Sequence, residues 1–382
     1  MRMLVAGGGT GGHVFPGIAL AEEVVTRHPA NDVVFVGTAR GLEATVVPKE
    51  GFPIELIDVK GLKGKSVLET LRNLVLLPLA FVQSFRILRR WRPDVVVGVG
   101  GYASGPVVLT AWLMRIPTAV QEQNAIPGFT NRVLGRFVQA CFTAFPEAAR
   151  HFPRRKVYQL GNPIRRNLME NFMRPEARHA TPRLLVFGGS QGAHALNMRV
   201  IEALPHLADL RDHLRVTHQT GARDREQVER GYQACGFAPD VREFITDMSG
   251  AYAGADLVVC RAGAMALAEL MVCKKPSILV PFPKAADNHQ FHNAMSLVDA
   301  GAAVMIEEHE LTGEVLAREI RALLGAPDRR DRMARAAGRL GSPQAAKEIA
   351  DVCTELVRNR WGSPTGQTRD GAEAPVRPAG GA

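Results

Sequence analysis

Residues 7–16 read GGGTGGHVFP, and this stretch decides the fold. It follows an apolar run, MRMLVA (1–6), and precedes IALAEEVV (18–25), in which apolar residues recur at helical spacing. A glycine-rich turn between a strand and a helix leaves backbone amides free at the helix N-terminus, where the helix dipole favours an anion. The stretch therefore predicts an α/β unit with a phosphate-binding turn. It also raises the question of why the turn ends in a histidine.

Apolar runs of strand type alternate with helical patterns along most of the chain. RLLVF (183–187), GGSQG (188–192) and a helical pattern from Ala193 repeat the order found at the start of the chain. Alternation of this kind predicts parallel sheets flanked by helices, here in two successive domains. The candidate strands are 2–6, 33–36, 54–57, 94–97, 117–120, 157–160, 183–187, 214–218, 256–259 and 277–280.

Composition agrees with a two-domain globular protein. The chain has 382 residues and 46% apolar residues, enough for large cores. Its five cysteines are scattered without a C-x-x-C pair, which argues against a zinc site or a disulfide framework and is typical of a reducing compartment. We expect neither a signal peptide nor a membrane-spanning segment. The formal charge of +9 permits anionic partners such as phosphates or acidic lipids.

The first glycine loop has more than one interpretation. Gly7, Gly9 and Gly12 satisfy the G-x-G-x-x-G spacing of dinucleotide-binding folds. The acid that usually follows the second strand is missing, and Arg40 there would suit a 2′-phosphate, so an NADP enzyme is one alternative. A tight turn that serves packing alone is another.

His13 is the residue that sets this loop apart. A histidine titrates near neutrality and is a common general base. At a helix N-terminus the dipole disfavours its charged form, so the imidazole tends to stay neutral and able to accept a proton. The alternative is a structural histidine that hydrogen-bonds a neighbouring loop.

Several stretches together carry a resemblance to a known family. The chain is similar to the MurG family of bacterial cell-wall glycosyltransferases, in order and over residues 1 to about 355. The stretches are GGTGGHVFPG (8–17), GVGGYASGP (98–106), EQNAIPGFTN (122–131), GNPIR (161–165), GGSQGA (188–193) and CRAGAMALAE (260–269).

The resemblance implies a GT-B fold, two Rossmann-like domains facing across a cleft. The implied domains are an acceptor and membrane domain at 1–160, a UDP-GlcNAc-binding domain at 161–342 and a helix at 343–360 that packs back on the first domain. Residues 361–382 are rich in Gly, Pro and Ala, and we expect a disordered tail there.

The implied reaction moves GlcNAc from UDP-GlcNAc to the 4-hydroxyl of the MurNAc-pentapeptide of lipid I, with inversion to a β-1,4 linkage, giving lipid II. It implies a peripheral enzyme on the cytoplasmic face of the bacterial plasma membrane, with other cell-wall synthesis proteins as candidate partners. The chain contains no D-x-D motif, so we expect neither an essential metal nor a cofactor.

Residue roles follow from the resemblance where the motifs match. His13 would be the base, and the leaving diphosphate would be met by the second glycine loop and Arg165. Gln290 matches least well, because the loop PFPKAADNHQ (281–290) is longer than is usual in the family. The implied substrate-binding residues are Thr10, Gly11, Gly12 and Asn124 near the sugar, Arg165, Ser190, Ile245, Ala264, Met265, Ala266, Leu267, Ala268 and Glu269 around the nucleotide, and Gln290 on the GlcNAc hydroxyls.

A lipid-linked acceptor requires contact with a membrane. Residues 73–82, NLVLLPLAFV, are apolar nearly all round, with Lys60, Lys63, Lys65 and Arg72 before them and Arg86, Arg89, Arg90 and Arg92 after them. Such a segment can enter the interface while its cations meet anionic head groups. The alternative is a buried helix with a solvated basic end. A nucleic-acid-binding protein is disfavoured by the 6% aromatic content and the lack of a reading motif.

Overall fold

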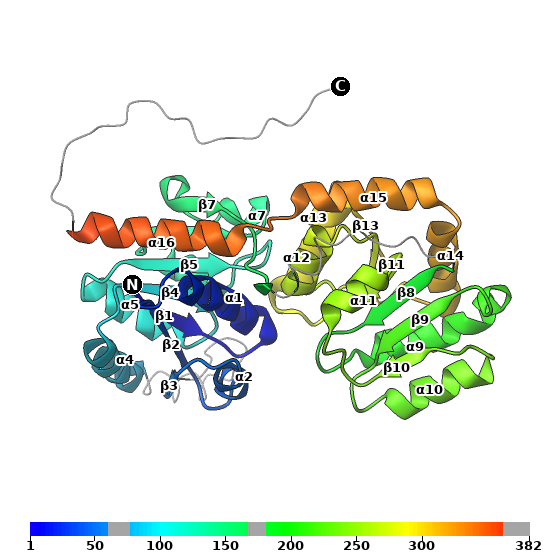
Figure 1. Ribbon diagram of the computed structural model, residues 1–382, viewed down its shortest axis with the longest axis horizontal. Helices are drawn as coiled ribbons and strands as arrows, with labels where there is room; N and C mark the ends of the chain where they lie inside the picture. The colour runs from blue at the N-terminus through cyan, green and yellow to red at the C-terminus, as the bar shows by residue number, and fades with distance from the viewer. Residues whose placement is uncertain (60–76, 167, 169–180, 362–382) are drawn as a thin grey trace, which may run out of the picture.

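A computed structural model of the chain describes residues 1–59, 77–166, 168 and 181–361. Two α/β bodies lie side by side, the first in blue and cyan and the second in green and yellow (Figure 1). Each is built on one parallel sheet with helices on both faces. The duplicated α/β organisation predicted from the sequence is therefore present.

The first body has a seven-stranded parallel sheet in the order β3-β2-β1-β4-β5-β6-β7. A parallel sheet covered on both faces needs apolar residues on both, and accordingly Val95–Gly100 is buried at every position. The strands are β1 (Arg2–Gly7), β2 (Asp32–Gly37), β3 (Ile54–Leu56), β4 (Val95–Gly100), β5 (Thr118–Glu122), β6 (Ala140–Thr143) and β7 (Val157–Gln159). The helices are α1 (Gly11–Arg27), α2 (Glu43–Lys49), α4 (Leu77–Trp91), α5 (Ser104–Leu113), α6 (Phe129–Leu134) and α7 (Pro146–Ala149).

The second body has a six-stranded parallel sheet in the order β10-β9-β8-β11-β12-β13. Its strands are β8 (Arg183–Phe187), β9 (Arg215–Gln219), β10 (Asp240–Arg242), β11 (Leu257–Cys260), β12 (Ser277–Leu279) and β13 (Ala303–Met305). Its helices are α9 (His194–Ala203), α10 (Arg225–Ala234), α11 (Met248–Gly254), α12 (Ala264–Val272), α13 (His289–Asp299), α14 (Gly313–Leu324) and α15 (Pro327–Leu340).

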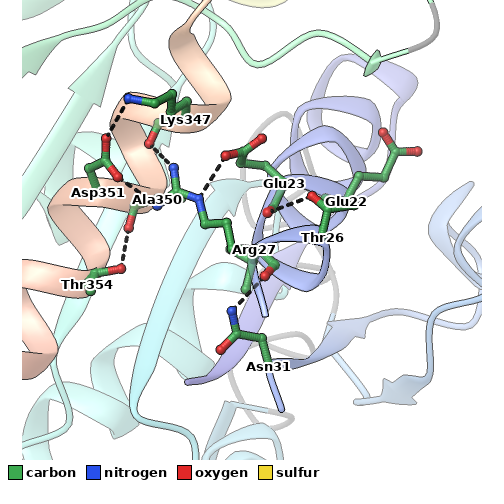
Figure 2. Close-up of polar contacts among 10 residues, drawn as sticks. Glu22, Glu23, Thr26, Arg27, Asn31, Lys347, Ala350, Asp351 and Thr354 are labelled. Carbon is green, nitrogen blue, oxygen red and sulfur yellow. Dashed lines mark hydrogen bonds and ion pairs between the residues drawn. The ribbon is translucent and has the colours of Figure 1, made fainter. Parts of the chain in front are cut away.

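The last helix, α16 (Ala345–Trp361), leaves the second body and lies against α1 and β4 of the first. Ile349, Ala350 and Cys353 are fully buried in the first body's core. Arg27 fixes the helix from the α1 side: its Nη1 lies 2.7 Å from Asp351 Oδ1, and its Nη2 donates to the carbonyl of Lys347 at 2.7 Å (Figure 2). The end of the chain thus stabilises the body in which the chain begins.

The chain passes between the bodies twice, and the two passages are adjacent. A Cβ on Gly161, which has a φ of +86°, would lie 2.3 Å from the Cβ of Ser342. Only a glycine fits at this close approach. Residues 361–382, the predicted tail, lie outside the described residues except for Trp361 at the end of α16.

Candidate functional site

Each sheet has one point where the direction of strand winding reverses. In the first sheet it lies between β1 and β4, and in the second between β8 and β11. Ligands of open α/β sheets bind beyond the carboxyl ends of the strands at such points. The two glycine loops, which follow β1 and β8, and the loop before α12, which follows β11, all lie there.

His13 occupies the first turn of α1, and its tautomer follows from its partner. Its Nδ1 lies 3.1 Å from the carbonyl oxygen of Gly8. A carbonyl can only accept, so Nδ1 carries the proton and Nε2 is left as the basic nitrogen. Burial lowers the pKa of His13, the hydrogen bond to Gly8 opposes this, and the nearby His289 of the second body lowers it further. The imidazole is therefore neutral at pH 7 and can accept a proton on Nε2.

Gly100, at the end of β4, leaves room for this imidazole. Its φ is +95°, and a Cβ there would lie 2.7 Å from Cδ2 and 2.9 Å from Nε2 of His13. Any side chain would displace the ring. Within the stretch 98–106, Gly100 is thus the residue that lies against His13.

The rest of the first loop is held by a buried carboxylate. Glu43 is 1% exposed and accepts hydrogen bonds from the amide of Gly9 at 2.6 Å and the amide of Thr38 at 2.8 Å. Thr10 is the exposed N-cap residue of α1, and Gly11 and Gly12 form its first turn. The loop therefore presents an open backbone surface next to His13.

Asn124 lies just beyond β5 and is half-buried. Glu122, which is 2% exposed, accepts from the backbone amide of Asn124 at 3.0 Å and from its Nδ2 at 3.3 Å. Burial raises the pKa of Glu122, while hydrogen bonds from Asn124, Asn131 and Gly128 oppose the rise. On its other side Asn124 Oδ1 accepts from Asn293 of α13 at 3.1 Å, so this loop contacts the second body directly.

In the second body, Ser190 is exposed in the loop between β8 and α9. Ile245 is 1% exposed, and its side chain belongs to the core. A uracil ring at this position would therefore contact the backbone of Ile245 and not its side chain. Gln219 links the two loops: its Nε2 donates to the carbonyl of Gly189 at 2.9 Å, and its Oε1 accepts from the amide of Ile245 at 2.8 Å. The loops of Ser190 and Ile245 are thus held as one surface.

The α12 helix carries the remaining nucleotide candidates. Leu267 and Ala268 are buried in the core, whereas Met265, Ala266 and Glu269 are half-buried. Burial raises the pKa of Glu269, and a hydrogen bond from Tyr252 Oη at 2.9 Å opposes the rise. Ala264 is the first residue of the helix, so its amide lies at the positive end of the dipole.

Arg165 and Gln290 complete the predicted set. The guanidinium of Arg165 lies 5.2 Å from the ring centroid of Phe15 on α1, and its charge also reaches Glu269. Gln290 is on the first turn of α13, and its Oε1 accepts from the backbone amide of Phe282 at 3.0 Å. The long loop 281–288 is thus tied near its start to Gln290.

Comparison with known proteins identifies the chain. Residues 3–143 match the glycosyltransferase family 28 N-terminal domain, and residues 183–350 match the family 28 C-terminal domain. A UDP-N-acetylglucosamine--N-acetylmuramyl-(pentapeptide) pyrophosphoryl-undecaprenol N-acetylglucosamine transferase of Anaeromyxobacter dehalogenans strain 2CP-1 is 82% identical over 99% of both chains. The crystal structure of Acinetobacter baumannii MurG is 31% identical, with a TM-score of 0.76, over 93% of this chain and 99% of that one. The chain belongs to the MurG family.

More distant MurG sequences agree. A Myxococcus xanthus strain DK1622 transferase of the same name is 62% identical over 98% of this chain and 97% of its own. The resemblance noted from the sequence and the GT-B fold of two Rossmann-like domains are both confirmed. The NADP alternative is wrong, because MurG proteins are glycosyltransferases.

Sequence reasoning did not single out the residues that hold the loops of this MurG protein. Glu43, Gln219 and Asn293 are buried polar side chains; Gln219 and Asn293 bond the predicted site residues Ile245 and Asn124, and Glu43 bonds Gly9 beside Thr10. Glu122 was part of a quoted motif but had no assigned role. The signal that the sequence offered for these residues was a polar side chain at a position where burial is expected. Such a side chain needs a hydrogen-bond partner, but the sequence does not say which partner that is.

Proposed function

We propose that this chain is an inverting transferase that moves GlcNAc from UDP-GlcNAc to the 4-hydroxyl of the MurNAc-pentapeptide of lipid I, producing lipid II. The observation that carries the proposal is the 82% identity, over 99% of both chains, to a transferase whose name states these substrates. In support, Thr10, Gly11, Gly12 and His13 follow β1, Ser190 follows β8 and Ala264 begins the helix after β11, and these strands flank the winding-reversal points of the two sheets.

In the proposed mechanism His13 Nε2 takes the proton of the acceptor hydroxyl as its oxygen attacks the anomeric carbon of GlcNAc. The bond from that carbon to the diphosphate oxygen breaks in the same displacement, so the α linkage of the donor becomes β. UDP leaves with the bonding electrons and gains negative charge. The amides around Ser190, the N-terminus of α9 and the Arg165 guanidinium would stabilise that charge.

The remaining assignments concern the donor, UDP-GlcNAc. We propose that Thr10, Gly11, Gly12, Asn124 and Gln290 contact the sugar. The backbone of Ile245 would hold the uracil, and the N-terminal turn of α12 with Glu269 would hold the ribose. Leu267 and Ala268, being buried, would act through the backbone and through the position of the helix.

We further propose that the first body docks on the cytoplasmic face of a membrane through α4. Ala80, Ser84, Ile87 and Leu88 face the core, and the opposite side exposes Leu79, Val82 and Phe85, which are 45%, 46% and 43% exposed. Arg89 lies over the Phe85 ring, with 5.7 Å from Cζ to the centroid. An apolar stripe with flanking arginines is typical of an interfacial helix.

The structure describes only part of the proposed membrane-docking surface around α4. Residues 73–76 of the predicted segment, with Lys60, Lys63, Lys65 and Arg72, lie outside the described residues. Within the described ranges no helix combines the length and apolar character needed to cross a bilayer. The neighbouring α5 packs against α4 and ends in Leu113, which is 64% exposed.

The transfer reaction can be tested directly. Purified chain is incubated with radiolabelled UDP-GlcNAc and a short-chain lipid I analogue, and labelled disaccharide product is separated and counted. We expect UDP-GlcNAc-dependent product with β-1,4 linkage, and undiminished turnover in excess EDTA. Absence of product with this acceptor would overturn the proposed function, and activity lost to EDTA and restored by a divalent ion would overturn the metal-free mechanism.

A further inference from the structure

Asn293, on α13 of the second body, is a fully buried side chain that makes hydrogen bonds to three residues of the proposed substrate loops. It is 0% exposed. Its Oδ1 accepts from the backbone amide of Ala125 at 2.8 Å, and its Nδ2 lies 3.1 Å from Asn124 Oδ1 and 3.3 Å from the carbonyl of Ala262. Asn124 and Ala125 belong to the first body, so this one residue joins the two bodies.

The hydrogen bonds fix the orientation of both amides. The backbone amide of Ala125 can only donate, so the Asn293 atom facing it is the oxygen, and Nδ2 points to Asn124 and Ala262. The Asn124 atom that receives this bond must then be its oxygen. Asn124 Nδ2 gives one hydrogen to Glu122 at 3.3 Å, and the second hydrogen is directed elsewhere. Asn124 therefore presents an N–H donor, not an acceptor.

The position of Asn293 connects three proposed contacts. Gln290 lies three residues earlier on the same helix, so the two side chains share a face of α13. Ala262 directly precedes Gly263, the N-cap of α12. A shift of Asn293 would thus change the position of Asn124, in the first body, relative to α13 and the N-terminus of α12, the two second-body elements that are proposed to bind the sugar and the nucleotide.

We propose that Asn293 is a positioning residue: across the junction of the two bodies it holds the Asn124 amide with its N–H toward an acceptor oxygen of the donor sugar. The inference rests on the proposed function, because it takes the donor to be UDP-GlcNAc. It assigns no contact between Asn293 and substrate. Its consequence is that the effect of Asn293 on donor use passes through Asn124.

The test substitution is Asn293→Asp. One carboxylate oxygen can still accept from Ala125, but the other cannot donate to Asn124 Oδ1 or to the Ala262 carbonyl and repels both. We expect the KM for UDP-GlcNAc to rise about tenfold, the loss of one hydrogen bond with an unfavourable contact in its place. The Kd of UDP, measured by calorimetry, should change less than about twofold, because UDP lacks the sugar.

A double-mutant cycle separates positioning from general damage. In the Asn124→Ala background, Asn293→Asp should raise the KM for UDP-GlcNAc less than about twofold further. Asn31→Asp, the same chemical change in a residue bonded to Val24 and the chain N-terminus, is the matched control. Thermal unfolding shows whether Asn293→Asp is folded. If it is not, Asn293→Ala replaces it in the same cycle, and we then expect a smaller rise in KM.

The outcomes are distinct. The positioning role would be overturned if Asn293→Asp raised the KM for UDP-GlcNAc as much in the Asn124→Ala background as in the wild-type chain. It would also be overturned if the single variant kept an unchanged KM, or if it weakened UDP binding as much as it raised the KM. Wild-type chain that binds UDP but transfers no GlcNAc would instead overturn the proposed function.

Discussion

His13 illustrates how a backbone carbonyl decides the chemistry of a side chain. The Gly8 carbonyl selects the tautomer, Gly100 leaves space for the ring, and burial lowers its pKa. The sequence indicated a neutral histidine from the helix dipole alone. The structure adds the particular nitrogen, Nε2, to which the proposed mechanism assigns the proton of the acceptor hydroxyl.

His13→Ala should leave UDP affinity within about twofold while kcat falls by about a hundredfold or more, because general-base catalysis commonly contributes that much. Calorimetry with UDP and the radiolabel assay measure the two quantities. His13 is excluded as the base if the variant keeps a kcat within about threefold of wild type.

The pH dependence of wild-type kcat follows from the same residue. The protonated imidazole cannot accept a proton, so the rate falls as the pH drops through the folded-state pKa and is constant above it. Because the pKa is lowered, the midpoint of this acid limb should lie below the ordinary histidine value of 6.5. A limb centred above 6.5 in a kcat–pH profile would contradict the assignment.

At the scale of elements, helix α16 depends on contacts that are far apart in the sequence. Its spacing predicted a helix, but its apolar residues are buried only because α1 and β4 supply the other half of the core. Arg27 joins the two helices through Asp351 and the Lys347 carbonyl (Figure 2). The guanidinium is largely covered, with 25% of the side chain exposed.

Arg27→Ala should lower the free energy of unfolding of the first body by about 1–2 kcal/mol, through loss of a charged hydrogen bond and a partly exposed ion pair. Urea unfolding followed by tryptophan fluorescence measures this, because all three tryptophans, Trp91, Trp112 and Trp361, lie in the first body or α16. Arg199→Ala, which removes an exposed ion pair with Glu202 in the second body, is the control. Equal midpoints for both variants would show that the Arg27 contacts do not hold α16.

The same scale explains the strands that were not predicted. β6 (Ala140–Thr143), β10 (Asp240–Arg242) and β13 (Ala303–Met305) are three or four residues long. Runs this short carry too little periodicity to be separated from loop consistently, and three equally short strands, β3, β7 and β12, were predicted. They become strands because each finds the open edge of a neighbour, as when Ala119–Glu122 of β5 pairs with Ala140–Thr143.

At the scale of the whole molecule, the chain carries a net charge of +9, and α4 exposes an apolar face. Both properties favour the proposed docking of α4 on an anionic membrane. The alternative, a buried helix with a solvated basic end, describes the core-facing side and the exposed arginines of α4 but leaves its exposed apolar side chains without a role. Each cation close to an anionic surface contributes about 1 kcal/mol, and salt screens that contribution.

Wild-type chain should therefore sediment with vesicles containing anionic phospholipid, and less so at high salt. Leu79→Glu and Phe85→Glu should each reduce the bound fraction severalfold, since they place a negative charge in the apolar stripe. Tyr158→Glu is the matched control. Tyr158 lies on β7, an edge strand of the first sheet and not part of α4, so this variant should bind vesicles as the wild type does. Unchanged sedimentation of the α4 variants would remove this helix from the membrane surface.

The sequence by itself determined the local units: the strands with long apolar runs, the glycine loops, the helix spacing and the motifs that mark the family. These depend on neighbours in the chain, through backbone conformation and periodicity. Only the tertiary structure decided which polar groups hold the loops. Glu43 accepts from Gly9, Gln219 accepts from Ile245 and Asn293 donates to Asn124, partners that lie 34, 26 and 169 positions away. These roles therefore exist only after the sheets and the junction of the two bodies have formed.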